Sequence, residues 1–287
     1  MAARPLKTDA LTVRKPRLVG RIVAGGMLRE NTPLEYYPQY NIFVKREDKA
    51  CVPPGPPFSK ARGVYSRILS RSETLIGALD TRHSQAGHAV ARACQVLGKQ
   101  CVNFYPQLKY EPEPKYAQLK AQELGAELYG LKGWAMGPQQ VLFHIAKKII
   151  TERGGYMMPN ALTMEESIVE TARECPTDQK FDWVLISASS GTIAAGVIKG
   201  LGLGPTYLIH LGYSIHQSRK QQYIRMASGV PTANLVLIDE KYAYKDKARP
   251  GETPPWPCNE FYDLKAFRWL INHRDEYPGK TLFWNIG

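Results

Sequence analysis

Short apolar segments alternate with helical patterns through most of this 287-residue chain. The expected strands cover residues 75–79, 100–105, 127–129, 156–158, 183–187 and 206–210, and the expected helices cover 85–97, 115–124, 137–151, 164–174 and 192–200. This alternation is typical of parallel sheets, because the crossover between two parallel strands usually contains a helix. The sequence therefore predicts an α/β protein with mostly parallel sheets.

Prolines interrupt this alternation between residues 242 and 259, at Pro250, Pro254, Pro255 and Pro257. Because proline lacks a backbone N–H and fixes its own backbone angle, a regular helix or strand is not expected there. We predict a long ordered loop, then a helix over 262–273 and a strand over 281–286. The end of the sequence would then lie within a sheet.

The composition is that of a folded intracellular protein, with 44% hydrophobic and 22% charged residues. The longest apolar runs, 183–188 and 206–211, are far shorter than the roughly 20 residues of a membrane-spanning helix. Residues 1–13 lack the apolar core of a signal peptide. Five cysteines without Cys-x-x-Cys spacing favour reduced thiols, and the histidines lack zinc-site spacing. We expect a cytoplasmic protein without a membrane segment or a metal.

The positive charge is concentrated in the first quarter of the chain. The net charge is +12, and residues 1–71 contain 14 Lys and Arg against 5 Asp and Glu. This excess has two interpretations of similar weight: a basic face that attracts nucleic acid, or a surface that only aids solubility. The candidate phosphate contacts are Arg14, Lys15, Arg17 and Arg21.

Three segments have the composition of a binding site. Lys60 stands after a proline-rich turn at an expected helix start, within Phe-Ser-Lys-Ala-Arg-Gly over 58–63. Ser84 precedes another expected helix start. Ser-Ala-Ser-Ser-Gly-Thr over 187–192 follows an apolar strand and opens a helix, where small residues let backbone N–H groups approach a phosphate. Taken singly, each has a simpler explanation, a solvated lysine or a serine that caps a helix.

Taken together, these segments resemble the fold-type II enzymes that use pyridoxal 5′-phosphate (PLP), within the tryptophan synthase β superfamily. The branch they resemble most is that of the 1-aminocyclopropane-1-carboxylate deaminases and D-cysteine desulfhydrases, over about residues 40–287. The resemblance implies two three-layer α/β domains: a large PLP-binding domain of residues 1–62 and 157–287, and a small inserted domain of residues 63–156. It also implies a possible homodimer, the usual assembly in the family.

The same resemblance implies roles for individual residues. Lys60 takes the position of the Schiff-base lysine, and burial near the cofactor would lower its pKa so that it can act as a base. Ser84 lies in the segment that receives the substrate carboxylate. Gln85 stands where the family has an asparagine that bonds the ring hydroxyl. Arg62 is expected to pack or pair locally.

Two further segments complete the implied site. The phosphate cup corresponds to Ser189, Ser190, Gly191 and Thr192. In the segment Cys-Asn-Glu-Phe-Tyr-Asp-Leu-Lys-Ala over 258–266, Tyr262 corresponds to the active-site tyrosine and Asp263 to the residue facing the pyridine nitrogen. A carboxylate there keeps that nitrogen protonated. The alternative for Asp263 is an aspartate that caps the last helix.

The chain also resembles bacteriophage PLP enzymes of thymidine hypermodification. This resemblance implies decarboxylation of an amino acid carried on the base in DNA, such as α-glycinyl thymidine, to an aminoethyl base that helps evade host restriction. The enzyme would then work in the host cytoplasm and bind DNA through its basic N-terminal quarter.

Two alternatives stay open. One is a deaminase or desulfhydrase acting on a free small amino acid, against which Gln85 and the single glycine that ends Leu-Phe-Trp-Asn-Ile-Gly over 282–287 argue. The other is a non-catalytic DNA-binding or scaffold protein, against which Lys60, Tyr262 and Asp263 argue.

Overall fold

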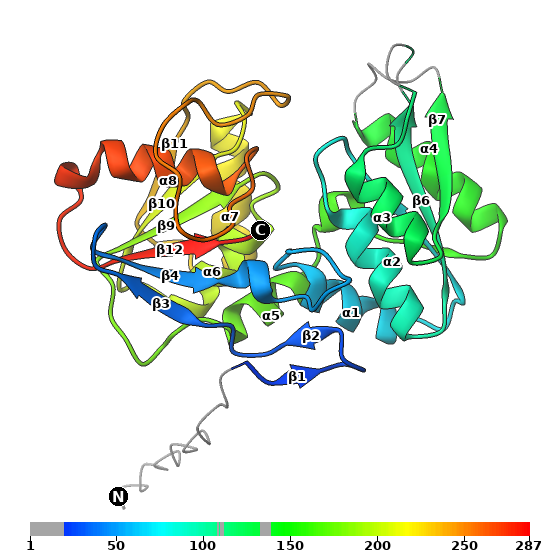
Figure 1. Ribbon diagram of the computed structural model, residues 1–287, viewed down its shortest axis with the longest axis horizontal. Helices are drawn as coiled ribbons and strands as arrows, with labels where there is room; N and C mark the ends of the chain where they lie inside the picture. Colours follow the sequence, from blue (N-terminus) through cyan, green and yellow to red (C-terminus); the bar gives the residue numbers. More distant parts are fainter. Residues whose placement is uncertain (1–19, 108, 110–111, 133–138) are drawn as a thin grey trace, which may run out of the picture.

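The computed structural model describes residues 20–107, 109, 112–132 and 139–287, which form two lobes side by side (Figure 1). One lobe contains a six-stranded sheet of order β11-β10-β9-β12-β4-β3, and the other a four-stranded sheet of order β7-β6-β5-β8. A hairpin of β1 (Ile22–Val23) and β2 (Leu28–Arg29) lies beside them. The predicted α/β fold with mostly parallel sheets is confirmed.

The six-stranded sheet brings together segments from both ends of the chain. Its strands are β3 (Leu34–Tyr37), β4 (Ile42–Arg46), β9 (Trp183–Ala188), β10 (Thr206–Leu211), β11 (Leu235–Ile238) and β12 (Thr281–Asn285). β3 is antiparallel to β4, and the other neighbours are parallel. The last strand lies within the sheet, as the sequence predicted, and the structure places it in the middle, between β9 and β4.

Alternate residues of these strands face two separate cores, as the strand period of two requires. Val184 and Trp284 pack with residues of α6 (Thr192–Leu201) and α7 (Gln217–Ser228). Leu185 and Phe283 pack on the opposite face with residues of α8 (Asp263–Asn272). This lobe therefore has three layers.

The four-stranded sheet is entirely parallel and is also covered on both faces. Its strands are β5 (Leu75–Leu79), β6 (Gln100–Gln107), β7 (Glu127–Lys132) and β8 (Tyr156–Met157). One core includes residues of α1 (Ala61–Leu69), α2 (Ala86–Val96) and α3 (Tyr116–Glu123), and the other includes residues of α4 (Gln139–Glu152). The helix α5 (Glu165–Arg173) packs between α1 and α6, where the lobes meet.

The helices and strands predicted from the sequence are present, with ends that differ by a few residues, and residues 242–259 form a loop. Among the described residues, the sequence did not predict the four N-terminal strands, α7, β11 or three short 3-10 helices, Glu47–Lys49, Asn160–Leu162 and Arg274–Glu276. The sequence did not predict α7 because most of Gln217–Ser228 is polar. Within this helix only Ile224 and Ser228 are buried. A helix with so narrow an apolar stripe gives a weak periodic signal.

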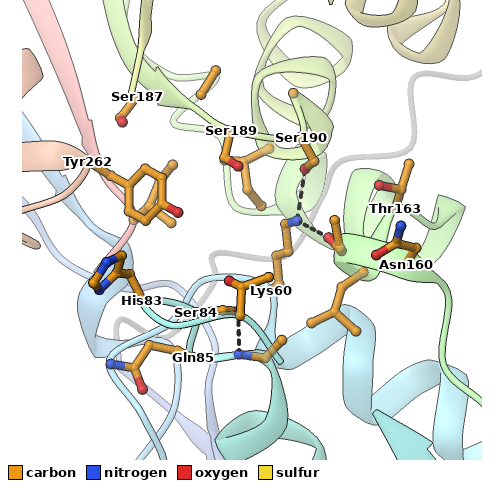
Figure 2. Close-up of a pocket in the computed structure, with 18 of the residues that line it drawn as sticks. Lys60, His83, Ser84, Gln85, Asn160, Thr163, Ser187, Ser189, Ser190 and Tyr262 are labelled. Carbon is orange, nitrogen blue, oxygen red and sulfur yellow. Dashed lines mark hydrogen bonds between the residues drawn. The ribbon is translucent and has the colours of Figure 1, made fainter. Parts of the chain in front are cut away.

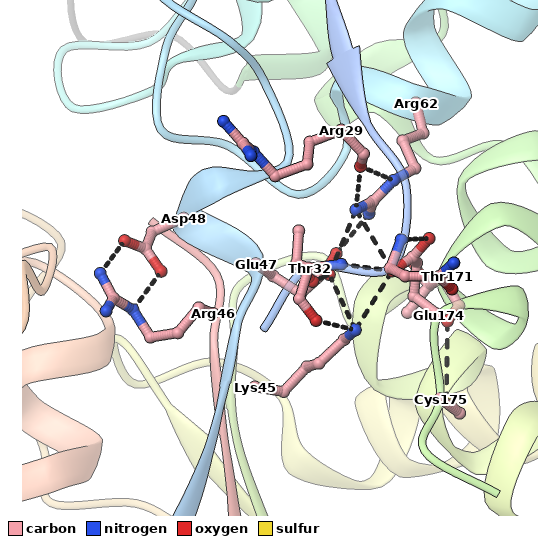
Figure 3. Close-up of polar contacts among 11 residues, drawn as sticks. Arg29, Thr32, Lys45, Arg46, Glu47, Asp48, Arg62, Thr171, Glu174 and Cys175 are labelled. Atoms are coloured by element: carbon pink, nitrogen blue, oxygen red, sulfur yellow. Dashed lines mark hydrogen bonds and ion pairs between the residues drawn. The ribbon is translucent and has the colours of Figure 1, made fainter. Parts of the chain in front are cut away.

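A buried ion network joins β4, α1 and the end of α5 (Figure 3). Arg62 donates to Glu47 at 2.5 Å and lies 3.5 Å from Glu174, and Lys45 lies 3.1 Å from Glu174. Glu47 also accepts a hydrogen bond from Thr32. These charged side chains are at most 5% exposed. The prediction that Arg62 pairs locally is confirmed, and its pairing fixes the helix turn that carries Lys60.

The network changes the meaning of the N-terminal charge excess. Lys45, Arg46 and Arg62 are buried in ion pairs, and Arg46 binds Asp48 through two hydrogen bonds of 2.7 and 2.9 Å. Arg21 is exposed, whereas Arg14, Lys15 and Arg17 lie outside the described residues. The excess of positive charge over residues 20–71 therefore does not form a single basic face. A count along the sequence includes the charges that are buried in ion pairs.

Several properties concern the described residues as a whole. No helix among them is long and apolar enough to cross a membrane. They contain no cluster of three His, Cys, Asp or Glu side chains that could hold a metal ion. The five cysteines are free thiols, and four of them are buried.

Candidate active site

A cavity of about 620 Å³ opens between the two lobes, within the range of about 300–1,000 Å³ that small-molecule sites occupy. Its wall includes residues that follow the carboxyl ends of β5, β9 and β12. This is where parallel α/β sheets usually bind ligands, because the connections diverge there. Both lobes therefore contribute to one site.

Lys60 reaches into this cavity from the residue that precedes α1 (Figure 2). Its Nζ donates hydrogen bonds to the Ala161 carbonyl at 2.7 Å and to Ser190 Oγ at 2.9 Å. Burial, together with the positive charge of Lys220, lowers the pKa of Lys60 to about 7. A lysine with a pKa near 7 has a substantial neutral fraction at that pH, and the neutral amine is the nucleophile and base that covalent cofactor binding requires.

The predicted phosphate cup follows the end of β9 and lies next to Lys60. Ser189, Ser190 and Gly191 line the cavity, and Gly191 precedes the first turn of α6 with φ +89°. A Cβ at Gly191 would lie 2.9 Å from Ile224 Cγ1, so both backbone conformation and space favour glycine. Thr192, the fourth residue of the predicted cup, is not among the residues that line the cavity, and its hydroxyl contacts Ser190 Oγ at 3.0 Å.

Lys220 is a cavity residue that the sequence did not predict. It projects from α7, and its Nζ donates to the Ser190 carbonyl at 2.9 Å. Burial lowers the pKa of Lys220. This places a cation against the cup, where it complements the N-terminus of α6 in attracting a phosphate. The sequence could have indicated Lys220 only if it had predicted α7, the helix that contains it.

The start of α2 forms the floor of the cavity with Ser84 and Gln85. Ser84 Oγ accepts the N–H of Ala86 at 3.0 Å, so Ser84 also contacts the first residue of the helix. Gln85 faces the cavity, and its Oε1 is buried without a hydrogen-bond partner among the described residues. Leaving a buried amide oxygen unpaired costs about 1–3 kcal/mol, so a hydrogen-bond donor placed beside it would be stabilising.

Tyr262 and Asp263 begin α8 at the opposite wall. Tyr262 lines the cavity, and burial raises its pKa. Asp263 is fully buried behind the wall that Tyr262, Ile286 and Gly287 form; its Oδ2 accepts the Gly287 N–H at 2.9 Å. Its Oδ1 has no partner in the described part of the chain, and burial raises the pKa of Asp263 to about 7.

The structure thus brings most of the predicted site residues to one cavity, and it sets two of them one layer behind. The cavity wall includes Lys60, Ser84, Gln85, Ser189, Ser190, Gly191 and Tyr262. Thr192 supports Ser190, and Asp263 stands behind Tyr262 and Gly287.

These residues fit PLP. Lys60 would supply an amine for its aldehyde, and the predicted cup with Lys220 would suit its phosphate. Asp263 Oδ1 and Gln85 Oε1 are buried atoms that still need partners. A protonated ring nitrogen would satisfy a carboxylate such as that of Asp263, and it would lower the raised pKa of that residue.

The sequence is 44% identical over 281 residues to the glycyl-dTMP PLP-dependent decarboxylase of Pseudomonas phage M6. The alignment covers 91% of this chain and all of the phage protein. The chain belongs to this PLP-dependent decarboxylase family. Its cofactor is PLP, as the sequence predicted, and the resemblance to phage thymidine-modifying enzymes is confirmed. No protein-family model matches the sequence of this chain.

Solved structures similar to this decarboxylase share its fold at low identity. A homologue of 1-aminocyclopropane-1-carboxylate deaminase has a TM-score of 0.70 and 18% identity, over 94% of this chain and 92% of that one. Threonine deaminase isoform 2 of Solanum lycopersicum has a TM-score of 0.63 and 14% identity, over 90% of this chain and 79% of the deaminase chain. Both confirm the fold-type II architecture.

Proposed function

We propose that this enzyme decarboxylates an amino acid attached to a thymidine nucleotide, leaving an amine on the base. The observation that carries the proposal is the 44% identity to a protein named for glycyl-dTMP, over that protein's whole length. The cavity supports it, because a cofactor amine, a phosphate cup and a buried carboxylate converge there. The deaminases of similar fold are too distant to favour their own reaction.

When bound, PLP supplies an electron sink for the electron pair left on Cα when a bond to it breaks. Lys60 would hold the cofactor through its Nζ, and the same atom lies where it can transfer a proton to a group in the cavity. Loss of CO₂ replaces the carboxylate on Cα with a hydrogen, so one proton must be delivered to Cα. The lowered pKa of Lys60, about 7, suits that transfer near neutral pH.

Other side chains orient the substrate and stabilise charge. Ser84 and the first turn of α2 face the cavity and favour an anionic substrate group such as the carboxylate. Asp263 favours a protonated ring nitrogen, which strengthens the electron sink. Tyr262 excludes water on the side opposite the cup.

The finer part of the proposal is biological: the substrate is modified thymidine in viral DNA, and the product protects that DNA from host restriction in the host cytoplasm. A base within a duplex would have to leave the helix to reach Lys60, at a cost of a few kcal/mol. Contacts with phosphates could offset this cost.

The proposal is tested by incubating the PLP-loaded enzyme with DNA and with dTMP that carry an α-glycinyl group on the thymine methyl. Nucleoside mass spectrometry should show loss of CO₂ and an aminoethyl base, and Lys60→Ala should show neither. Release of ammonia from a free amino acid, without any change in the modified nucleotide, would favour the deaminase or desulfhydrase alternative.

A further inference from the structure

The Lys60 amine is bonded to a segment with an unusual backbone. Ala161 and Leu162, in the short 3-10 helix Asn160–Leu162, have φ angles of +54° and +51°. In the described part of the chain, they are the only consecutive non-glycine residues with positive φ. Alanine and leucine rarely adopt this left-handed conformation, because their Cβ is crowded there. Such residues are concentrated at functional sites, where the surrounding structure maintains them.

Contacts on both sides hold this left-handed turn in place. Leu162 is 3% exposed and packs in the core that includes residues of α1 and α2. Its N–H donates to the Pro159 carbonyl at 2.9 Å, and Gln139 Nε2 donates to Asn160 Oδ1 at 2.9 Å. Ala161 and Leu162 also line the cavity. The turn therefore joins the core of the small lobe to the wall of the site.

The turn directs one backbone carbonyl at the Lys60 amine. Lys60 Nζ donates to the Ala161 carbonyl at 2.7 Å and to Ser190 Oγ at 2.9 Å, and Figure 2 shows both bonds as dashed lines. A neutral amine has two N–H bonds and one lone pair. The two acceptors account for both N–H bonds, so the lone pair has no partner among the described residues. This lone pair is the part of the amine that attacks an aldehyde.

The residue types in the turn also matter. Residues 159–163 read Pro-Asn-Ala-Leu-Thr and contain no glycine. Glycine would adopt a positive φ at lower cost, but it would leave the backbone more freedom. Alanine and leucine restrict the turn once the surrounding contacts have selected its conformation. The Ala161 carbonyl is therefore a well-defined acceptor.

We propose that the left-handed turn of Ala161 and Leu162 is a positioning element for Lys60. Whenever the amine is not bonded to the cofactor, the turn holds it beside Ser190 with its lone pair free to react. The inference rests on the proposed function in one respect, that Lys60 is the lysine that binds PLP. It does not depend on which amino acid is decarboxylated.

Two substitutions of similar size at Ala161 test the turn. Valine is β-branched and strongly disfavours positive φ, whereas asparagine tolerates it. When the apoenzyme binds PLP, Lys60 Nζ replaces the aldehyde oxygen, which leaves as water with the two amine hydrogens. Ala161→Val should form this lysine–cofactor adduct, trapped with borohydride, roughly tenfold more slowly, because a small misplacement of a reacting group costs rate steeply. Ala161→Asn should recover most of that loss.

Binding of pyridoxine 5′-phosphate separates positioning from damage to the site. This analogue has a hydroxymethyl group in place of the aldehyde, so it occupies the site without bonding to Lys60. Its affinity for the apoenzyme, measured by calorimetry, should be the same for Ala161→Val as for the native protein. Leu162→Val disfavours the same turn at its second residue and should show the same pattern. It provides the test if Ala161→Val does not fold.

Ala24 provides the matched control. It has a φ of +55° in the turn between β1 and β2, and it does not line the cavity. Ala24→Val should lower the midpoint of urea unfolding, as Ala161→Val should, because both place a β-branched residue at positive φ. Adduct formation should be unchanged in Ala24→Val.

The results separate the two proposals. The positioning role is overturned if Ala161→Val forms the adduct at the native rate, or if Ala161→Asn is as slow as Ala161→Val. It is also overturned if Ala161→Val loses as much affinity for pyridoxine 5′-phosphate as it loses rate. If the variants behave as expected but the native enzyme releases no CO₂ from glycyl-dTMP, the turn positions Lys60 and the proposed decarboxylation fails.

Discussion

Two buried polar regions lie on either side of the first turn of α1, and their hydrogen bonding differs. In the ion network, Lys45, Glu47, Arg62 and Glu174 are paired with one another, and backbone groups complete their bonding. In the cavity wall, Gln85 Oε1 and Ser187 Oγ are buried without a partner among the described residues, and so is Asp263 Oδ1 directly behind that wall.

The difference fits a structural role for the network and a ligand-binding role for the cavity; unpaired buried atoms also occur elsewhere in the fold, as at Asp80 Oδ1, Asn103 Oδ1 and Trp284 Nε1. Buried polar groups that serve the fold are normally satisfied within it, because an unpaired one is costly. Groups that await a ligand remain unpaired in its absence. Lys60 and Arg62 are two residues apart, yet Arg62 belongs to the paired network and Lys60 to the cavity. We therefore expect changes in the network to affect folding, and changes in the cavity to affect the cofactor and the reaction.

The largest expected effect is on the cavity side. Lys60→Ala should reduce CO₂ release by at least about 10²–10⁴-fold, the range expected for loss of a positioned proton-transfer group. It should also abolish the lysine–cofactor adduct that borohydride traps, while the midpoint of urea unfolding changes little. An adduct found by peptide mapping at a different lysine would contradict the assignment.

The next effect is on the network. Glu47→Ala leaves Arg62 and Lys45 buried with one partner fewer, so the free energy of unfolding should fall by about 3–5 kcal/mol. Urea unfolding measures this loss. The exposed pair of Lys148 and Glu152, 3.8 Å apart, provides the control: Glu152→Ala should change stability little. Equal losses for the two variants would refute the distinction between the regions.

Asp263 should affect turnover more than cofactor binding. Asp263→Asn keeps an acceptor for the Gly287 N–H but cannot stabilise a protonated ring nitrogen, so kcat should fall by more than about tenfold, or about 1.4 kcal/mol. PLP should remain bound, as its absorbance will show. Unchanged kcat would reduce Asp263 to a structural role at the start of α8.

The same variant should alter the pH dependence of the apoprotein's stability. The pKa of Asp263 is raised from 3.8 to about 7 in the folded protein. The folded state therefore binds a proton more tightly than the unfolded state, and this contribution to stability, complete below pH 3.8, is lost as the pH rises toward 7. Asp263→Asn should remove that loss from urea unfolding curves measured between pH 4 and 7.

The smallest expected effect concerns Lys220. Lys220→Met removes the cation beside the Ser190 carbonyl, so the apoenzyme should bind PLP roughly fivefold more weakly, the equivalent of about 1 kcal/mol. Inorganic phosphate should compete less well for the variant than for the native apoenzyme. Lys199→Met is the matched control, and an equal change there would show a general charge effect rather than a contact with the cup.

Much of the fold and part of the site could be predicted from local sequence. The strand-to-helix segment at 187–192 and the lysine at the start of α1 are recognisable because their residue types and order are contiguous. The sequence did not reveal α7, whose polar composition gives weak periodicity, and it therefore missed Lys220. The stacking of His83 on Phe261 was also beyond prediction, since these residues are far apart in the chain.

The sequence by itself determined the α/β class, the order of most elements from residue 60 onward and the residue types available to hold PLP, because these depend on local periodicity and short motifs. Only the tertiary structure decided which charges are internal and which polar atoms face the cavity. Lys45, Arg46 and Arg62 add to the same positive count as Arg21, but burial against carboxylates removes them from the surface. Burial and ion pairing depend on contacts between segments that are distant in the sequence. A count of charged residues along the chain does not include those contacts.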